Sequence, residues 1–286
     1  MILLSLVGEQ PIPNLLMARF YKPDCHYLVC SPFTENAANR LKEMDSTCDV
    51  KRTDQPYDIG SVLNDLREWK IEPDVVNFTG GTKPMALAAY EFAKIKKTPF
   101  VYLQSEGKKS VIYEYDLSSN PLSTKKITLG PLINIEDYLQ VHGQKDWVET
   151  SASNAQEVGL AIWFKAHTDE CISNLHYGIG EVDFIIRRQN QVAVVESKMV
   201  KKVDRKGIDQ LNTICGRENL GTYTGKILII QNPLGTRLQQ LAEDRNINVI
   251  QVSGEIPVDK EYFVPDTESE IKLERLLDKL LGPSLE

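Results

Sequence analysis

Short apolar segments alternate with helical patterns through the first part of the chain, and this alternation limits the fold more than any other feature. We expect strands at five segments: Ile2–Val7, Tyr27–Cys30, Val50–Thr53, Val75–Phe78 and Phe100–Gln104. Helical patterns lie between them, at Ile12–Phe20, Glu35–Met44, Ile59–Trp69 and Lys83–Ile95. Strands joined by helices are typical of a mostly parallel, doubly wound sheet with helices on both faces. Two antiparallel strands are expected to finish this domain, at Val111–Asp116 and Lys125–Leu129.

The second half of the chain arranges its elements differently. It begins with a helix near Ser153–His167, where Ser153 and Gln156 fit a capping box, and continues with a polar-turned hairpin within Gly180–Met199. Further elements are expected in this order: a helix at Gly207–Arg217, a strand at Lys226–Ile230, a helix at Thr236–Arg245, a strand at Val249–Val252 and a helix at Glu268–Leu281. With 286 residues, the chain is long enough for two domains.

The overall composition excludes some classes of protein. A formal net charge of −7 argues against tight, non-specific coating of nucleic acid. No apolar run approaches the length of a membrane span, and the N-terminal Met1–Val7 segment is interpreted as a core strand rather than a leader. The five cysteines form no CxxC pair, which favours reduced thiols in a cytoplasmic protein.

The hairpin carries three charged residues that could form a metal-binding or catalytic site. Glu196 and Lys198 are two residues apart on one predicted strand, so their side chains point to the same face. If the strands turn about Gln189–Gln191, Asp183 joins them. An isolated Glu-x-Lys is most often an ion pair, but an acid within the apolar run Val182–Ile186 needs a partner. Two carboxylates and an ammonium can hold a divalent metal and polarise a water.

Polar and basic residues surround this hairpin. Glu157 lies near the start of the preceding helix, where a first-turn acid favoured by the helix dipole is the alternative interpretation. Gln210 lies on the following helix and is equally consistent with an exposed polar residue. The basic residues form either a solvated face or a guide for phosphates. They are Arg187, Arg188, Lys198, Lys201, Lys202, Arg205 and Lys206.

Two loops in the first half favour a ligand. The segment Asn77–Met85 follows a predicted strand and opens a helix, and its two glycines allow the backbone to approach a ligand. Lys83 and the helix N-terminus favour anions, although the segment is neither a Walker A motif nor a GxGxxG motif. The loop Gly8–Asn14 follows the first strand at the same sheet edge. Together the loops predict a phosphate- or nucleotide-binding crevice rather than two tight turns.

The order Glu157, Asp183, Glu196-x-Lys198, Gln210 resembles the PD-(D/E)XK nuclease superfamily, and helix–hairpin–helix–strand is the order of a restriction-endonuclease-like core. Val182 stands where the motif has proline. The resemblance implies that these five residues form the catalytic site. It further implies Mg²⁺ or Mn²⁺ held by Asp183, Glu196 and the Ser197 carbonyl, with Glu157 binding directly or through water. Lys198 would orient the attacking water and stabilise transition-state charge.

The two loops in the first half are similar to those of the CARF domain, the nucleotide-sensing fold of type III CRISPR ancillary proteins. The branch fused to a C-terminal PD-(D/E)XK nuclease is especially close. The resemblance implies an α/β protein with a Rossmann-like CARF domain at residues 1–135 and a restriction-endonuclease-like α/β domain at 145–286. It also implies a cytoplasmic homodimer that binds cyclic oligoadenylate, most often cyclic tetra-adenylate, across its two-fold axis. The implied ligand contacts are Gln10, Thr79, Gly80, Gly81, Thr82 and Lys83, followed by Gly8, Asn14 and Ser31.

Three functions are compatible with these motifs. The first is an antiviral endonuclease that cuts RNA or DNA with little sequence preference once the cyclic ligand has acted allosterically. The second is a ligand-binding regulator whose nuclease-like domain is only structural, against which the intact Asp183, Glu196 and Lys198 set argues. The third, compatible with the first, is a ring nuclease in which Lys83 helps to cleave the cyclic ligand.

Overall fold

The computed structural model describes residues 1–119, 122–150, 152, 154–177, 180–200 and 203–284. The chain divides into two compact units. The first unit comprises residues 1–133 and 140–143, and the second comprises residues 134–139 and 144–286. The short helix α5, Ile135–Val141, contributes residues to both units.

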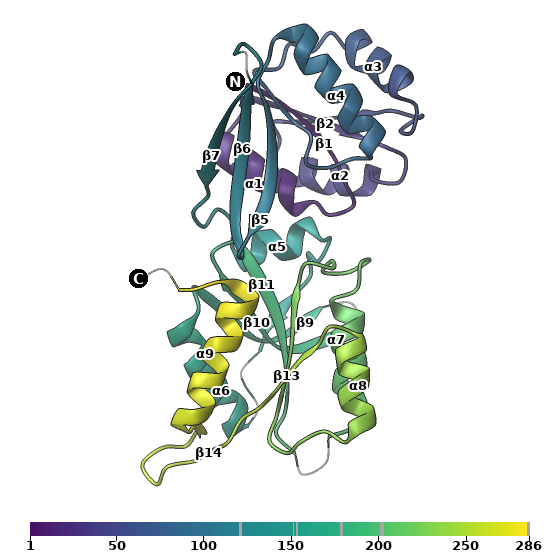
Figure 1. Ribbon diagram of the computed structural model, residues 1–286. Coiled ribbons are helices and arrows are strands. Elements are labelled where there is room, and N and C mark those ends of the chain that lie inside the picture. The colour runs from purple at the N-terminus through teal and green to yellow at the C-terminus, as the bar shows by residue number, and fades with distance from the viewer. Residues whose placement is uncertain (120–121, 151, 153, 178–179, 201–202, 285–286) are drawn as a thin grey trace. The chain divides into compact units, whose positions relative to one another are not determined.

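The first unit contains a seven-stranded sheet in the order β3-β2-β1-β4-β5-β6-β7 (Figure 1). The first five of these strands are parallel, and β6 and β7 add antiparallel pairs at one edge. The strands are β1 Ile2–Leu6, β2 Cys25–Cys30, β3 Cys48–Arg52, β4 Val75–Asn77, β5 Phe100–Glu106, β6 Lys109–Asp116 and β7 Ser123–Thr128. The helices are α1 Ile12–Tyr21, α2 Glu35–Met44, α3 Ile59–Glu68 and α4 Lys83–Lys96.

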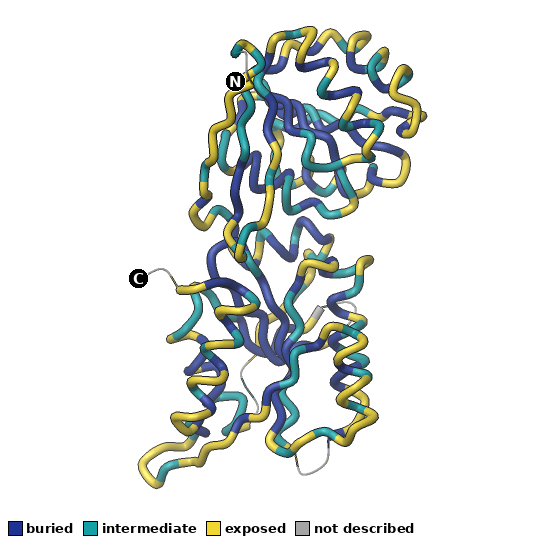
Figure 2. The backbone as a smooth tube through the Cα atoms, in the orientation of Figure 1, coloured by how far each residue is buried: buried dark blue, intermediate teal, exposed yellow. Residues whose placement is uncertain are grey.

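Helices cover both faces of this sheet, because right-handed crossovers to the left and to the right of β1 place α1 and α2 opposite α3 and α4. The α3 and α4 side chains pack on the face that carries Leu4, Leu6 and Val76. Figure 2 shows the strands largely buried and the outer helix turns exposed. The parallel sheet predicted from the alternation is confirmed, with every predicted strand and helix end of this unit within two residues of the observed one.

The second unit contains a six-stranded mixed sheet in the order β13-β12-β11-β10-β9-β8. Strands β8 to β11 pair antiparallel, whereas β11, β12 and β13 are parallel. The strands of this sheet are β8 Val148–Glu149, β9 Glu170–Tyr177, β10 Gly180–Arg188, β11 Gln191–Lys198, β12 Gly225–Ile230 and β13 Asn248–Gln251. A separate antiparallel pair is formed by β14 Gly254–Glu255 and β15 Val264–Pro265. The helices are α6 Ala155–His167, α7 Lys206–Ile214, α8 Thr236–Asp244 and α9 Thr267–Leu281.

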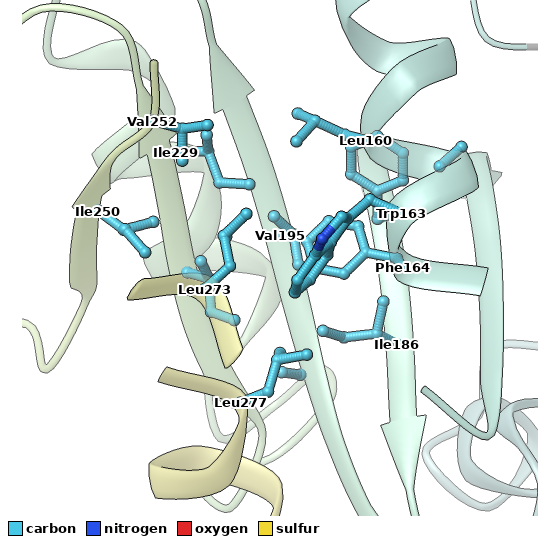
Figure 3. Close-up of a cluster of buried hydrophobic side chains, with 14 of the residues drawn as sticks. Leu160, Trp163, Phe164, Ile186, Val195, Ile229, Ile250, Val252, Leu273 and Leu277 are labelled. Atoms are coloured by element: carbon cyan, nitrogen blue, oxygen red, sulfur yellow. The ribbon is translucent and has the colours of Figure 1, made fainter. Parts of the chain in front are cut away.

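Helices α6 and α9 form the apolar core of this unit together with one face of the sheet (Figure 3). Phe164 of α6 and Leu277 of α9 meet Ile186 of β10 and Val195 of β11, and all four side chains are buried. Gly159 makes this packing possible, because a Cβ atom there would lie 1.8 Å from the carbonyl oxygen of Phe263. The core fixes which face of the hairpin remains for chemistry, namely the face opposite Val195.

Some elements of the second unit differ from the expectation. Strand β9 was not predicted, because Asn174 and His176 interrupt its apolar alternation. The expected cap Ser153 lies outside the described residues. Asn154 caps α6 instead, and its side chain accepts a hydrogen bond from the Glu157 amide at 2.9 Å. None of the helices in the described part of the chain is long and apolar enough to cross a membrane.

Candidate metal centre and ligand-binding loops

The hairpin of β10 and β11 gathers its three charged residues on one face. The register pairs Phe184 with Val195, which places Asp183 beside Glu196 one step further along the ladder. Asp183 accepts a hydrogen bond from the Ser197 amide at 2.6 Å through its Oδ2 atom. Lys198 Nζ donates to Glu196 Oε1. The two-residue spacing predicted for Glu196 and Lys198 therefore produces a direct contact.

Both carboxylates are removed from solvent. Asp183 is 8% exposed and Glu196 is 1% exposed. Burial raises the pKa of Asp183 to about 6, although the Ser197 amide and Lys198 partly oppose the shift. Burial and the negative charge of Asp183 raise the pKa of Glu196 to about 7. Burial acts to lower the pKa of Lys198, but the hydrogen bond and charge of Glu196 outweigh it and raise that pKa.

The start of helix α7 lies over these side chains. Gly207, in the first turn of α7, has no side chain, and a Cβ atom there would contact Glu196 Cγ and Lys198 Cε, each at 3.4 Å. Gly207 itself is buried. The helix thereby shields the pair from water on one side, which strengthens the electrostatic interactions between the charges.

One feature of the carboxylates, an oxygen without a hydrogen-bond partner among the described residues, fits a divalent cation. Glu196 Oε2 is buried and has no hydrogen-bond partner among the described residues, although a carboxylate oxygen in such a place needs one. A hard cation satisfies a lone oxygen of this kind and relieves the repulsion between two buried acids. Within the described residues, no group of three or more His, Cys, Asp or Glu side chains is arranged to hold a metal.

The remaining predicted catalytic residues, Glu157 and Gln210, form hydrogen bonds outside the pair. Glu157 accepts a hydrogen bond from Asn154 Nδ2 at 2.6 Å, and its charge contributes to the raised pKa of Asp183. Gln210 Nε2 donates to the backbone carbonyl of Glu181 on β10, so it braces the strand that carries Asp183. Glu181 was missed in the sequence, although its position two residues before Asp183 was the available signal. Its charge also raises the pKa of Asp183.

The interpretation of the basic residues as a solvated face or a guide for phosphates is wrong for two of them. Arg187 is 11% exposed in its side chain and pairs with Asp169 and Glu170. Arg188 is 1% exposed and pairs with Glu274 and Asp278 of α9. Both lie at the turn end of the hairpin, far along the strands from Asp183. They are structural ion pairs that the sequence alone presents as a charge run. The predicted Lys201 and Lys202 fall outside the described residues.

In the first unit, the two predicted loops meet at the carboxyl end of β1. A Cβ atom on Gly80 would lie 2.4 Å from the carbonyl oxygen of Leu6 and 2.6 Å from the amide nitrogen of Gly8. Gly81 adopts a φ of 74°, which glycine accepts without strain. The glycines therefore do more than make the loop flexible. They allow the two backbones to pass close to each other.

Several predicted ligand contacts already use their side chains within the protein. Thr82 caps α4 by accepting from the Met85 amide at 3.2 Å, and its hydroxyl donates to the Pro56 carbonyl at 2.6 Å. Ser31 is buried and its hydroxyl shares a hydrogen bond with Thr34 at 3.2 Å. Asn14 is fully buried and donates to the Leu6 carbonyl at 3.0 Å. These three residues shape the loops.

Other predicted contacts face outward. Gly81 and Lys83 are exposed, and Gln10 is half-buried. Lys83 is the first residue of the 14-residue helix α4, where the helix dipole favours negative charge. Backbone amides, a helix N-terminus and an ammonium at one sheet edge form an arrangement suited to phosphate groups.

The comparison with protein-family models decides the identity of this unit. The model described as the Card1 CARF domain matches residues 2–138. Residues 2–138 form a CARF domain. No sequence among the curated proteins matches the chain.

Solved structures that share the fold extend beyond the CARF domain. Can2 from Sulfobacillus thermosulfidooxidans, determined with cyclic tetra-adenylate, superposes with a TM-score of 0.73 at 14% identity, covering 98% of this chain and 99% of that one. VC1899 from Vibrio cholerae gives 0.70 at 12% identity, covering 87% and 93%. A type III CRISPR defence DNA nuclease activated by cyclic oligoadenylate gives 0.65 at 15% identity, covering 98% of this chain but 52% of that one. The fold of this chain therefore recurs in solved structures.

Proposed function

We propose that this protein is a metal-dependent endonuclease of type III CRISPR antiviral defence whose CARF domain binds a cyclic oligoadenylate that switches cleavage on. The buried pair of Asp183 and Glu196 carries the nuclease half of the proposal, because Glu196 Oε2 has no partner among the described residues and Lys198 lies in direct contact. A solely structural ion pair would not require a second, buried acid with a raised pKa beside it.

The ligand half of the proposal rests on the CARF match and on the loops at the carboxyl end of its sheet. Can2 was determined with cyclic tetra-adenylate, and we propose the same ligand for this chain. Its phosphates would lie against the exposed Gly81 backbone and the Lys83 ammonium, and Gln10 would contact the nucleotide from the neighbouring loop. We further propose a homodimer, because two copies of these loops would match a ring with repeated nucleotides.

At the second site, Mg²⁺ or Mn²⁺ would be held by Asp183, Glu196 and the carbonyl of Ser197, with Glu157 acting through water. A cation there supplies a Lewis acid that polarises the scissile phosphate. The chain's own residues do the rest. Lys198 presents its ammonium beside Glu196 to orient the attacking water and to neutralise charge that develops on the phosphoryl oxygens. Gly207 and the first turn of α7 limit water around the pair.

A single set of reactions tests this function. RNA and DNA, single- and double-stranded, are incubated with Mn²⁺ in the presence and absence of each cyclic oligoadenylate. Cleavage is expected only with metal and cyclic tetra-adenylate together. Glu196→Ala should abolish cleavage while leaving the affinity for cyclic tetra-adenylate within about twofold, because the two sites share no residue. Cleavage that needs no cyclic nucleotide, or that Glu196→Ala retains, contradicts the proposal.

A further inference from the structure

A chain of buried polar side chains crosses one face of the CARF sheet and ends at the ligand loop. Asn77 Nδ2 on β4 donates to Ser5 Oγ on β1 at 3.2 Å, and Ser5 Oγ lies 2.8 Å from His26 Nε2 on β2. His26 Nδ1 in turn lies 3.7 Å from Cys48 Sγ on β3. Asn77 and Ser5 are fully buried, and His26 is 1% exposed. Four neighbouring strands therefore contribute one polar side chain each to an otherwise apolar layer.

The orientation of the Asn77 amide follows from the loop end of this chain. The Thr79 amide donates to Asn77 Oδ1 at 3.1 Å, and because a backbone N–H can only donate, this atom must be the oxygen. The amide nitrogen of Asn77 then faces Ser5, whose oxygen accepts. Burial lowers the pKa of His26 to about 4, so its ring is neutral near pH 7 and shares a hydrogen bond with Ser5 through Nε2. The network thus holds the Asn77 amide in a single orientation.

Thr79 transmits this orientation to the next strand. Its hydroxyl donates to Asn77 Oδ1 at 2.6 Å and accepts from the Leu103 amide of β5 at 2.8 Å. The regular pairing of β4 with β5 ends where the Phe78 amide donates to the Val101 carbonyl. Beyond that point the chain leaves the sheet, and the Thr79 hydroxyl takes the place of a backbone carbonyl for Leu103. Asn77 and Thr79 together form an Asx turn clamped to two strands.

The clamp lies immediately before the two glycines of the loop. Gly80 has almost no freedom, since its Cα hydrogen faces the Leu6 carbonyl and the Gly8 amide. A shift of Thr79 would therefore move Gly80 and Gly81 against the Gly8 loop. Because both hydrogen-bonding directions of the Thr79 hydroxyl are used within the protein, it is poorly placed to serve as a direct ligand contact.

We propose that Asn77 and Thr79 are positioning residues, which with Ser5 and Leu103 hold the Gly80–Gly81 backbone in the shape that receives a phosphate of the cyclic ligand. This inference rests on the proposed function for the identity of the ligand. The shape of the loop itself does not depend on it. A preorganised loop lowers the entropy lost on binding, so removal of the clamp should weaken affinity without deleting a ligand contact.

The CARF domain offers a matched control for the test. Thr98 is a buried threonine, whereas Thr79 is half-buried, and the Thr98 hydroxyl donates to the Pro73 carbonyl at 3.0 Å, at the amino end of the sheet away from the loop. Thr79→Val and Thr98→Val each remove one hydrogen-bonded hydroxyl from the same domain. Thr79→Ser keeps the hydroxyl and serves as the conservative rescue. Calorimetric titration of each full-length, dialysed variant with cyclic tetra-adenylate gives the affinity. The hydrogen-exchange rate of the Leu103 amide shows whether its bond to the Thr79 hydroxyl is intact.

Thr79→Val should weaken binding of cyclic tetra-adenylate at least about tenfold and accelerate Leu103 exchange, because the hydrogen bonds of the Thr79 hydroxyl are lost. Thr79→Ser should remain within about threefold of the wild type, and Thr98→Val should not change either measurement. Wild-type affinity in Thr79→Val, or equal losses in Thr79→Val and Thr98→Val, would overturn the inference. If the wild type binds no cyclic oligoadenylate, the proposed function fails. Hydrogen exchange of the Leu103 amide then tests whether Thr79 holds the loop. Unchanged exchange in Thr79→Val would refute the clamp.

Discussion

Replacement of Glu196 by glutamine is expected to stabilise the metal-free protein at neutral pH while abolishing the proposed cleavage. Burial raises the pKa of Glu196 from 4.5 to about 7, so the folded state binds more protons than the unfolded state between these values. Wild-type stability should therefore fall as the pH rises through this window, and glutamine removes that loss. The free energy of unfolding of Glu196→Gln relative to wild type should rise by roughly 2–3 kcal/mol from pH 4.5 to 7.5.

The measurement uses urea unfolding in the presence of a chelator, followed by the fluorescence of Trp163, which lies in the core of the second unit. Replacing Trp69 and Trp147, the other two tryptophans, by phenylalanine isolates this signal. Glu218→Gln, a change of an exposed glutamate in the same unit, is the matched control and should give no pH-dependent difference. A difference between Glu196→Gln and wild type that stays constant across the pH range would refute the reasoning.

Three further predictions concern other parts of the chain. Gly80→Ala places a Cβ atom 2.4 Å from the Leu6 carbonyl oxygen and should weaken cyclic tetra-adenylate binding at least about tenfold by calorimetry. Gly159→Ala should destabilise the second unit by about 3 kcal/mol in urea, although alanine favours helices, because its Cβ atom would overlap the Phe263 carbonyl at 1.8 Å. Burial lowers the pKa of His26 from 6.5 to about 4, so the CARF domain should lose about 3 kcal/mol of stability as the pH falls through that range. Hydrogen exchange of β1 amides measures this loss, which His26→Gln should remove.

Much of the fold follows from sequence periodicity because both sheets are built from local signals. Short β-branched runs separated by helical patterns predicted β1 to β5 within two residues. Strand β9 was beyond this reasoning, because Asn174 and His176 give it no regular alternation. Helix α5 was not predicted, because it has only seven residues and lies between Gly130 and Gly143.

The sites were predictable to a different extent. The contact between Glu196 and Lys198 followed from strand geometry alone, whereas the hydrogen bond from the Ser197 amide to Asp183 was not predicted. The sequence does not show which charged residues are buried. Arg188 has the charge of a phosphate guide, but its side chain is 1% exposed and forms a structural ion pair. The network that ends at Asn77 joins residues that are far apart in the sequence, so no local sequence pattern predicts it.

The central claim is that the ligand bound at the CARF domain controls the reaction at Glu196. The most direct measurement is the single-turnover cleavage rate of a labelled nucleic acid with Mn²⁺, titrated with cyclic tetra-adenylate, for wild type and Glu196→Gln. The account predicts that the wild-type rate rises at least about 100-fold, with a midpoint that matches the calorimetric dissociation constant, while Glu196→Gln binds the ligand and does not cut. A wild-type rate that is the same with and without the ligand, or cleavage by Glu196→Gln, would contradict it.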